Sequence, residues 1–257
     1  MISKSQIKAI QRLHQKKHRE EKRLFIAEGP KVVNELLKSK FIVKEIFARE
    51  ALKIEIFPKG LLRGKLIVEE ISEKELKQIS TLTTPNQVLG VFEIPDVKLN
   101  IESLKQELVL ALDDIRDPGN LGTIIRIADW FGIKNILCSE NCVDLFNPKV
   151  VQATMGSIAR VNVYCENLES ILLELKTFLP VYGSTVDGEN IYSGELSSNG
   201  IILIGNESKG ISENLLKLAF RKISIPSFSS GADSLNAAIA TAVICSEFRR
   251  RQQKVAG

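Results

Sequence analysis

The sequence predicts an α/β fold in which buried parallel strands alternate with helices. Residues 107–114 (ELVLALDD) and 200–207 (GIILIGNE) are almost continuous apolar runs, as strands have when helices cover both faces of a sheet. Helix-start signals follow such strands, for example Asn147 before Pro148. This alternation of element types is typical of a parallel sheet with helices on both sides.

The first ninety or so residues are predicted to form a smaller α/β domain. Pro30 suits the first position of a helix, and Ser72 with Glu75 has the spacing of a capping box. Residues 95–100 (PDVKLN) are a short polar stretch that we interpret as a linker, so the predicted domains are 1–96 and 104–257. Before the linker, the expected strands are 25–29, 43–48, 65–70 and 88–94, and the expected helices are 30–39 and 72–80.

After the linker, strands and helices are expected to alternate as far as the last helix. Gly132 is placed to end the helix over 120–132. The other expected helices are 147–157, 168–176, 212–220 and 234–251, and the expected strands are 107–114, 134–139, 181–185, 200–207 and 222–226.

The composition is typical of a folded soluble protein. The 257 residues are 44% hydrophobic and 26% charged, with a net charge of +4. The longest apolar stretch, 237–245, is too short to cross a bilayer, and the basic N-terminus lacks the apolar segment of a secretory signal. The four cysteines form no C-x-x-C pattern, which indicates reduced thiols. We therefore expect a cytoplasmic protein that makes no membrane contact.

Basic residues are concentrated at the N-terminus, where residues 1–23 hold eight basic and two acidic side chains. Four of the basic residues recur at every fourth position, which places them along one face of a predicted helix. Such a stripe suits the phosphate backbone of a nucleic acid, although a solvated helix face has the same pattern. The four candidate RNA-binding residues are Lys4, Lys8, Arg12 and Lys16.

Histidine occurs only in this basic segment, as His14 and His18. The spacing of the pair would allow both to hold a metal ion, but no third ligand lies nearby in the sequence, and we predict no metal site. Because no histidine follows residue 23, a Ser-His-Asp or Cys-His mechanism is excluded for the rest of the chain.

Three loops are candidates for a shared active site: 112–132, 203–212 and 225–240. Each follows a predicted buried strand and precedes a helix, and ligands of parallel sheets bind beyond the carboxyl ends of the strands. The chain contains no G-x-G and no complete G-x-x-x-x-G-K-[ST] sequence, which argues against a dinucleotide-binding turn and against phosphoryl transfer from ATP.

The three loops together resemble the three motifs of the SPOUT superfamily, in its SpoU (TrmH) family of RNA ribose 2′-O-methyltransferases. The resemblance covers about residues 108–250, and it departs at Ser208, where glycine is common, and at Ser227, where methionine is common. The first motif matches RDPGNLGTIIRIADWFG, the second LIGNESKGIS and the third IPSFSSGADSLNAAIA. The residues at the motif positions are Asn120, Arg126, Gly205, Asn206, Glu207, Ile225, Pro226, Ser234, Leu235 and Asn236.

The resemblance implies a parallel-sheet domain whose C-terminal segment passes through a loop, forming a deep trefoil knot. It also implies that a small α/β domain similar to a ribosomal protein comes first and selects the RNA. The methyl donor is expected to be S-adenosylmethionine, held mostly by backbone groups of the knotted loops. By the same resemblance, the donor-binding residues are Gly205, Ile225, Leu235, Ser234 and Thr185.

The resemblance further implies that Arg126 assists deprotonation of the ribose hydroxyl or stabilises the alkoxide, while Asn120, Glu207 and Asn236 orient it. An arginine is a poor free base, and this favours the electrostatic role. Taken singly, each residue has a structural interpretation: Asn120 as a helix cap, Glu207 as a charge at a helix start, Asn236 as a loop anchor. Arg126 would then pair with Asp113, Asp114 or Asp129.

Family members act as homodimers, with the final helix and the helix of the first motif at the interface. The resemblance therefore predicts a dimeric methyltransferase acting on ribosomal RNA, because of the extra N-terminal domain. Transfer RNA is an alternative substrate, a non-catalytic RNA-binding or ribosome-assembly factor is an alternative function, and a small-molecule α/β enzyme is a third.

Overall fold

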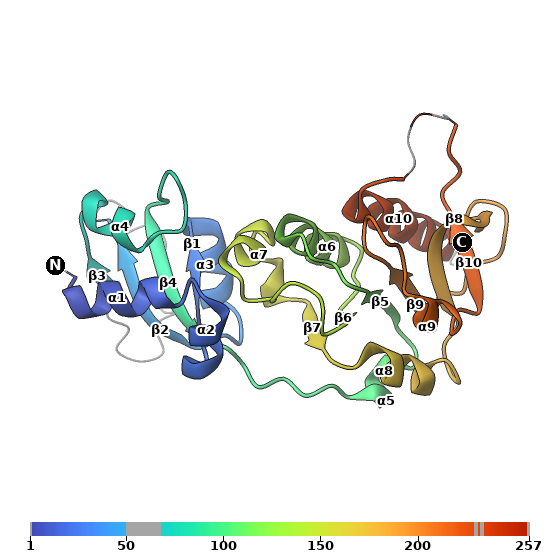
Figure 1. The fold of residues 1–257 in the computed structure, drawn as a ribbon, viewed down its shortest axis with the longest axis horizontal. Helices are drawn as coiled ribbons and strands as arrows, with labels where there is room; N and C mark the ends of the chain where they lie inside the picture. Colours follow the sequence, from blue (N-terminus) through green and yellow to red (C-terminus); the bar gives the residue numbers. More distant parts are fainter. Residues whose placement is uncertain (1, 50–67, 229–230, 232–233, 256–257) are drawn as a thin grey trace. The chain divides into compact units, whose positions relative to one another are not determined.

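The computed structural model describes residues 2–49, 68–228, 231 and 234–255, with side chains as far as 252. These residues form two compact units, shown in Figure 1. The first unit contains residues 1–96 together with 144–160, and the second contains 97–143 together with 161–257, as far as they are described. The division into domains 1–96 and 104–257 stays a prediction.

The sheet of the first unit has the order β1-β4-β2-β3. Strand β4 runs antiparallel to both of its neighbours, and β3 runs parallel to β2. The strands are β1 (Leu24–Glu28), β2 (Val43–Ala48), β3 (Val68–Glu70) and β4 (Val88–Glu93). Each lies within a strand expected from the sequence, except that β1 begins one residue earlier, and residues 65–67 of the expected strand 65–70 lie outside the described residues.

The α-helices among the described residues of this unit are α1 (Lys4–Arg12), α2 (Lys16–Lys22), α3 (Pro30–Leu37), α4 (Glu73–Ile79) and α7 (Pro148–Ala153). The predicted capping box is confirmed, because the Ser72 hydroxyl accepts from the Glu75 amide while the Glu75 carboxylate accepts from the Ser72 amide. Helix α7 follows the second unit's strand β6 in the chain, yet Val151 packs in the core of the first unit with Phe25.

The basic N-terminal residues do not lie on one helix, so that part of the prediction is wrong. Helix α1 ends at Arg12, and Lys16 is the first residue of α2. The reason is the buried side chain of Arg19, which donates to the Leu13 carbonyl at 2.8 Å and to the Asp144 carboxylate. The carbonyl at the end of α1 is thereby satisfied, and the chain turns before α2 begins. Lys4, Lys8, Arg12 and Lys16 are all exposed.

The sheet of the second unit has the order β10-β8-β9-β5-β6-β7, and every neighbouring pair is parallel. This confirms the predicted α/β class. The strands are β5 (Leu108–Leu112), β6 (Asn135–Cys138), β7 (Asn162–Cys165), β8 (Val181–Asn190), β9 (Gly200–Ile204) and β10 (Arg221–Ser224). Strand β8 is longer than expected, since it continues past a register shift against β10. The trefoil knot stays a prediction.

The helices of this unit are α5 (Ile101–Leu104), α6 (Pro118–Trp130), α8 (Leu168–Leu175), α9 (Glu213–Leu216) and α10 (Ala237–Val255). Helix α9 is shorter than the expected 212–220, and α10 packs on α6. Helix α6 begins before Asn120, because the Asp117 side chain caps it. None of the described helices combines the length and hydropathy needed to span a bilayer.

A buried carboxylate anchors the C-terminal helix. Glu247 on α10 accepts two bonds of 2.7 Å from Arg250 and one of 2.6 Å from Arg251. Arg251 in turn donates to the carbonyls of Ile191 and Gly194, which follow β8. These hydrogen bonds, led by those from Arg250, hold the pKa of Glu247 at about 2, below its ordinary 4.5. The ionised carboxylate therefore ties α10 to the loop after β8.

We expect Glu247→Gln to lower the free energy of unfolding most at neutral pH. Because the folded pKa is depressed, the stabilisation is complete above pH 4.5 and is lost as the pH falls towards about 2. Urea unfolding of both proteins from pH 7 to pH 2.5 measures this difference. The exposed Glu174→Gln is the matched control. If the free energy of unfolding of Glu247→Gln were lower than that of the wild type by the same amount at every pH, the depressed pKa of Glu247 would not be its cause.

Candidate active site

The three candidate loops begin at the same edge of the parallel sheet, after β5, β9 and β10. The first two are joined directly. Buried Asp113 accepts from the Ser212 amide at 2.8 Å through its side chain, and its own amide donates to the Ile204 carbonyl at 2.8 Å. The carboxylate thus links the end of β5 to the residue that precedes α9.

Asp114 makes a second connection between the first two loops. Its carbonyl accepts from the Asn206 amide group at 2.8 Å, and its carboxylate accepts from Arg116 at 2.6 Å. The backbone of Asp114 has a φ of 55°, a left-handed conformation that aspartate tolerates better than most residues, and its amide donates to Ser139. The polar groups of both loops are therefore held by one another.

Asn120, Glu207 and Asn236 form a continuous hydrogen-bonded line. The Asn120 Nδ2 donates to the Glu207 carboxylate, and the Asn236 Nδ2 donates to Asn120 Oδ1 at 2.9 Å. The Asn120 side chain does not cap α6, because Asp117 does so, and the structural interpretation of Asn120 as a cap is wrong. Each member of the line comes from a different predicted motif. The structure therefore brings three of the four predicted catalytic residues together.

Arg126, the fourth predicted catalytic residue, is separate from this line. Its side chain is exposed and makes no hydrogen bond or ion pair with any residue that the structure describes, including the three aspartates considered from the sequence. Six positions along a helix correspond to about 240° of rotation, so Arg126 lies on another face of α6 than Asn120. That face also carries Trp130, one turn further on, which is 85% exposed.

Gly205 is needed by the loop itself. A Cβ at this position would lie 2.2 Å from the carbonyl carbon of Gly210 and 2.3 Å from the amide nitrogen of Ile211, a distance that backbone atoms cannot accommodate. The absent side chain lets the chain fold back on itself, and Asn206 and Gly210 then pair through two backbone hydrogen bonds. The sequence prediction attributed this glycine to donor binding, whereas the described contacts are within the loop.

The other residues predicted to bind the methyl donor provide a polar hydroxyl group and apolar surface. Thr185 Oγ1 is buried, and its interaction with the Asp187 carboxylate lowers the pKa of that carboxyl group. Leu235 is 48% exposed, Ile225 is half-buried and Ser234 is exposed. These features fit a ligand with an apolar ring and polar substituents, as S-adenosylmethionine has. Among the described residues no group of three metal-ligating side chains occurs.

Sequence reasoning missed the residues that tie the loops together. It considered Asp113 and Asp114 only as partners of Arg126, and it assigned no role to Ser212. The sequence feature that could have indicated them is the pair of acidic residues directly after a buried strand. Buried carboxylates at such a position need hydrogen-bond donors, and the backbone amides of the neighbouring loop supply them. Loop coordinates were required to show which amides these are.

Comparisons with known proteins agree with this geometry. Residues 107–246 match the model of the SpoU rRNA Methylase family, and residues 4–90 match that of the MRM3-like substrate binding domain. The chain belongs to the SpoU rRNA methylase family. This confirms the family inferred from the three motifs, and the first match covers all three loops.

The most similar relatives include proteins that match over nearly their whole length. The chain is 34% identical over 245 residues to the 23S rRNA (guanosine(2553)-2′-O)-methyltransferase RlmP of Bacillus subtilis, covering 95% of each protein. Among solved structures, it resembles a TrmH-family protein from Porphyromonas gingivalis (TM-score 0.87, 37% identity, 98% of this chain and 99% of the other). It also resembles the AdoMet-bound rRNA methyltransferase from Sinorhizobium meliloti (TM-score 0.85, 32% identity, 98% and 96%).

We expect Gly205→Ala to destabilise this family member by about 1–3 kcal/mol, because the added methyl group must displace backbone. Chemical denaturation measures the loss, and calorimetry should show weaker binding of S-adenosylmethionine. Gly119→Ala in α6 is the matched control, since its Cβ would meet only a side-chain oxygen of Asp117 at 3.0 Å. If the two variants were equally stable, a methyl group at position 205 would not clash with the backbone of Gly210 and Ile211.

Proposed function

We propose that this protein transfers the methyl group of S-adenosylmethionine to the 2′-hydroxyl of a ribose in ribosomal RNA. The observation that carries the proposal is the hydrogen-bonded line of Asn120, Glu207 and Asn236, which joins all three SpoU motifs at one edge of the sheet. The names of the relatives support the substrate class, since that of RlmP specifies 2′-O-methylation of 23S rRNA.

The donor supplies a methyl group already activated by its sulfonium. The protein must therefore hold the donor and the ribose in line and favour loss of the hydroxyl proton. The buried Thr185 hydroxyl and the exposed surface of Leu235 would hold the donor. The hydrogen bonds of Asn120, Glu207 and Asn236 would hold the three loops in fixed relative positions. The residues on different loops that bind S-adenosylmethionine would then stay aligned.

Arg126 is the residue that we assign to the ribose oxygen. An arginine stays protonated, so its contribution is to stabilise the alkoxide that develops as the proton leaves. The described residues offer Arg126 no anionic partner, and its charge is available to substrate.

The RNA would also contact the first unit. The match of residues 4–90 to a substrate-binding domain supports this role. The exposed basic side chains of α1 and α2 are suited to binding phosphates, although they lie on two short helices and not on a single helix. These residues are Lys4, Lys8, Arg12 and Lys16. A cytoplasmic location is part of the proposal and is supported by the four free cysteines.

The test is transfer of tritiated methyl groups from S-adenosylmethionine to purified RNA, with mapping of the modified ribose. We expect labelling of 23S rRNA by the wild type, and a loss of turnover of about a hundredfold or more in Arg126→Ala. Donor affinity measured by calorimetry should change by less than about twofold, because the role proposed for Arg126 is at the ribose oxygen and not at the donor. Labelling of tRNA alone would select the alternative substrate. Donor-independent RNA binding without transfer would indicate a non-catalytic factor.

We further propose that the protein acts as a homodimer through α6 and α10. The two helices pack on each other and leave large apolar side chains exposed, namely Trp130 at 85% and Ile239 at 56%. A hollow lined by Trp130, Phe131 and Ser246 lies on the same pair of helices. A second copy would cover this surface. Since Arg126 shares a helix face with Trp130, the same contact would bring Arg126 to the partner's site.

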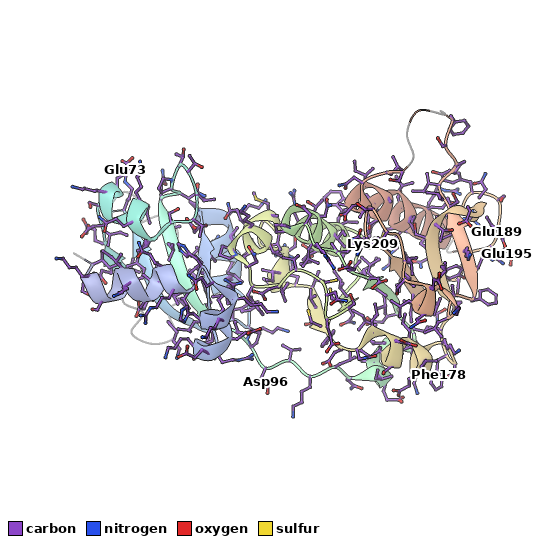
Figure 2. The ribbon with its side chains drawn as sticks, viewed as in Figure 1. Glu73, Asp96, Phe178, Glu189, Glu195 and Lys209 are labelled. Carbon is purple, nitrogen blue, oxygen red and sulfur yellow. The ribbon has the colours of Figure 1, made fainter. Side chains whose placement is uncertain are left out.

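We expect Trp130→Glu to convert a dimer to a monomer in size-exclusion chromatography with light scattering. Phe178→Glu is the matched control, because Phe178 is 53% exposed and lies beside α8 (Figure 2). If Arg126 acts across the interface, mixing Arg126→Ala with Glu207→Ala should restore about a quarter of wild-type activity, since half of random dimers then have one intact site. Monomeric wild type, or mixtures without activity, would contradict the arrangement.

A further inference from the structure

The turn between Asn206 and Gly210 is held rigidly by its own hydrogen bonds. Asn206 Oδ1 accepts from the Ser208 amide at 2.9 Å and from the Lys209 amide at 3.1 Å. Two backbone bonds of 3.0 and 2.9 Å join Asn206 to Gly210 across the turn. The residues at its tip, Ser208 and Lys209, are exposed, and Lys209 is labelled in Figure 2. The turn thus presents two side chains on a backbone that is already ordered.

The charges around this turn leave Lys209 without a partner. Four acidic groups of the two joined loops are already engaged: Asp113 with Ser212, Asp114 with Arg116 and Asn206, Asp117 with the Asn120 amide, and Glu207 with the Asn120 side chain. The Arg116 guanidinium pairs with Asp114. Among the described residues, Lys209 makes no ion pair and no side-chain hydrogen bond.

The Ser208 hydroxyl is also uncommitted. No hydrogen bond joins it to the described residues, and its side chain is exposed. A hydroxyl donor and an ammonium group are therefore carried by consecutive exposed residues that directly follow Glu207, which is bonded to Asn120. A phosphate oxygen accepts both kinds of donor, and the hydroxyl adds a directed bond to the charge.

We propose that Ser208 and Lys209 form a binding subsite for a phosphodiester group of the RNA strand, next to the ribose that is methylated. The inference rests on the proposed function, because a ribose in RNA is flanked by phosphates that must approach the loops when its 2′-hydroxyl reaches the donor. Because the backbone of the turn is already fixed, binding a phosphate costs mainly the conformational entropy of one long side chain, that of Lys209. The subsite belongs to the second unit and acts at the reacting nucleotide.

One other anion in the reaction could occupy the same position, namely the carboxylate of the methyl donor. The two anions are distinguished by measuring donor affinity and RNA affinity separately. A phosphate contact changes only RNA binding and its dependence on salt, because counterions are released from RNA and not from the small donor.

The experiment uses the full-length chain and an RNA fragment that the wild type methylates, so a failure of the proposed function is seen first, as absent wild-type transfer. We expect Lys209→Ala to raise the KM for RNA about fivefold at low salt and to reduce the slope of log KM against log salt by about 0.7. The kcat and the calorimetric affinity for S-adenosylmethionine should stay near wild type. Lys209→Arg should keep the slope.

Two further variants make the result specific. Ser208→Gly should raise the KM about twofold without changing the salt slope, since a hydroxyl carries no charge. Lys217→Ala removes the same charge from an exposed site at the end of α9, which lies away from the three loops, and should behave as wild type. An unchanged slope in Lys209→Ala, an equal effect of Lys217→Ala, or a loss of donor affinity would each overturn the proposal.

Discussion

The side-chain amide of Asn120 is the connection on which the site depends. It donates to the carboxylate of Glu207 and accepts from the amide of Asn236, so one residue at the start of α6 joins two loops that lie 87 and 116 positions further along the chain. A side-chain amide offers both a donor and an acceptor, so it can serve both partners at once. An aspartate would repel Glu207, and an alanine would leave both partners without their bond.

Around this connection, the loops are stabilised by groups that belong to the sheet. Asp113 and Asp114 follow β5 directly and bond to Ser212 and Asn206 of the second loop. Because the strands are parallel neighbours, their carboxyl ends lie at one edge, and short polar side chains are sufficient to bridge the loops. The geometry of the site is therefore a direct consequence of strand order.

Local signals predicted most of the fold, and non-local contacts account for the rest. The capping box at Ser72 and the cap at Asn147 depend on residues within one turn, and both occur as expected. The end of α1 depends on Arg19, which is paired with the distant Asp144, and no local pattern marks it. Likewise, the motifs placed Asn120, Glu207 and Asn236 together. The separation of Arg126 from them follows from the phase of α6, because six positions along a helix turn the side chain by about 240°.

The segment 144–160 has a consequence for any attempt to divide the protein. It lies between β6 and β7 in the chain, yet Val151 and Ile158 complete the core of the other compact unit, beside Phe25. A cut in the polar stretch 95–100 would therefore not yield two self-sufficient fragments. The N-terminal piece would lack part of its own interior, and the C-terminal piece would carry those apolar side chains uncovered. To separate the two units completely, the chain must be cut at three places. A permuted or co-expressed version of the first unit would have to include residues 144–160 so that its core is complete.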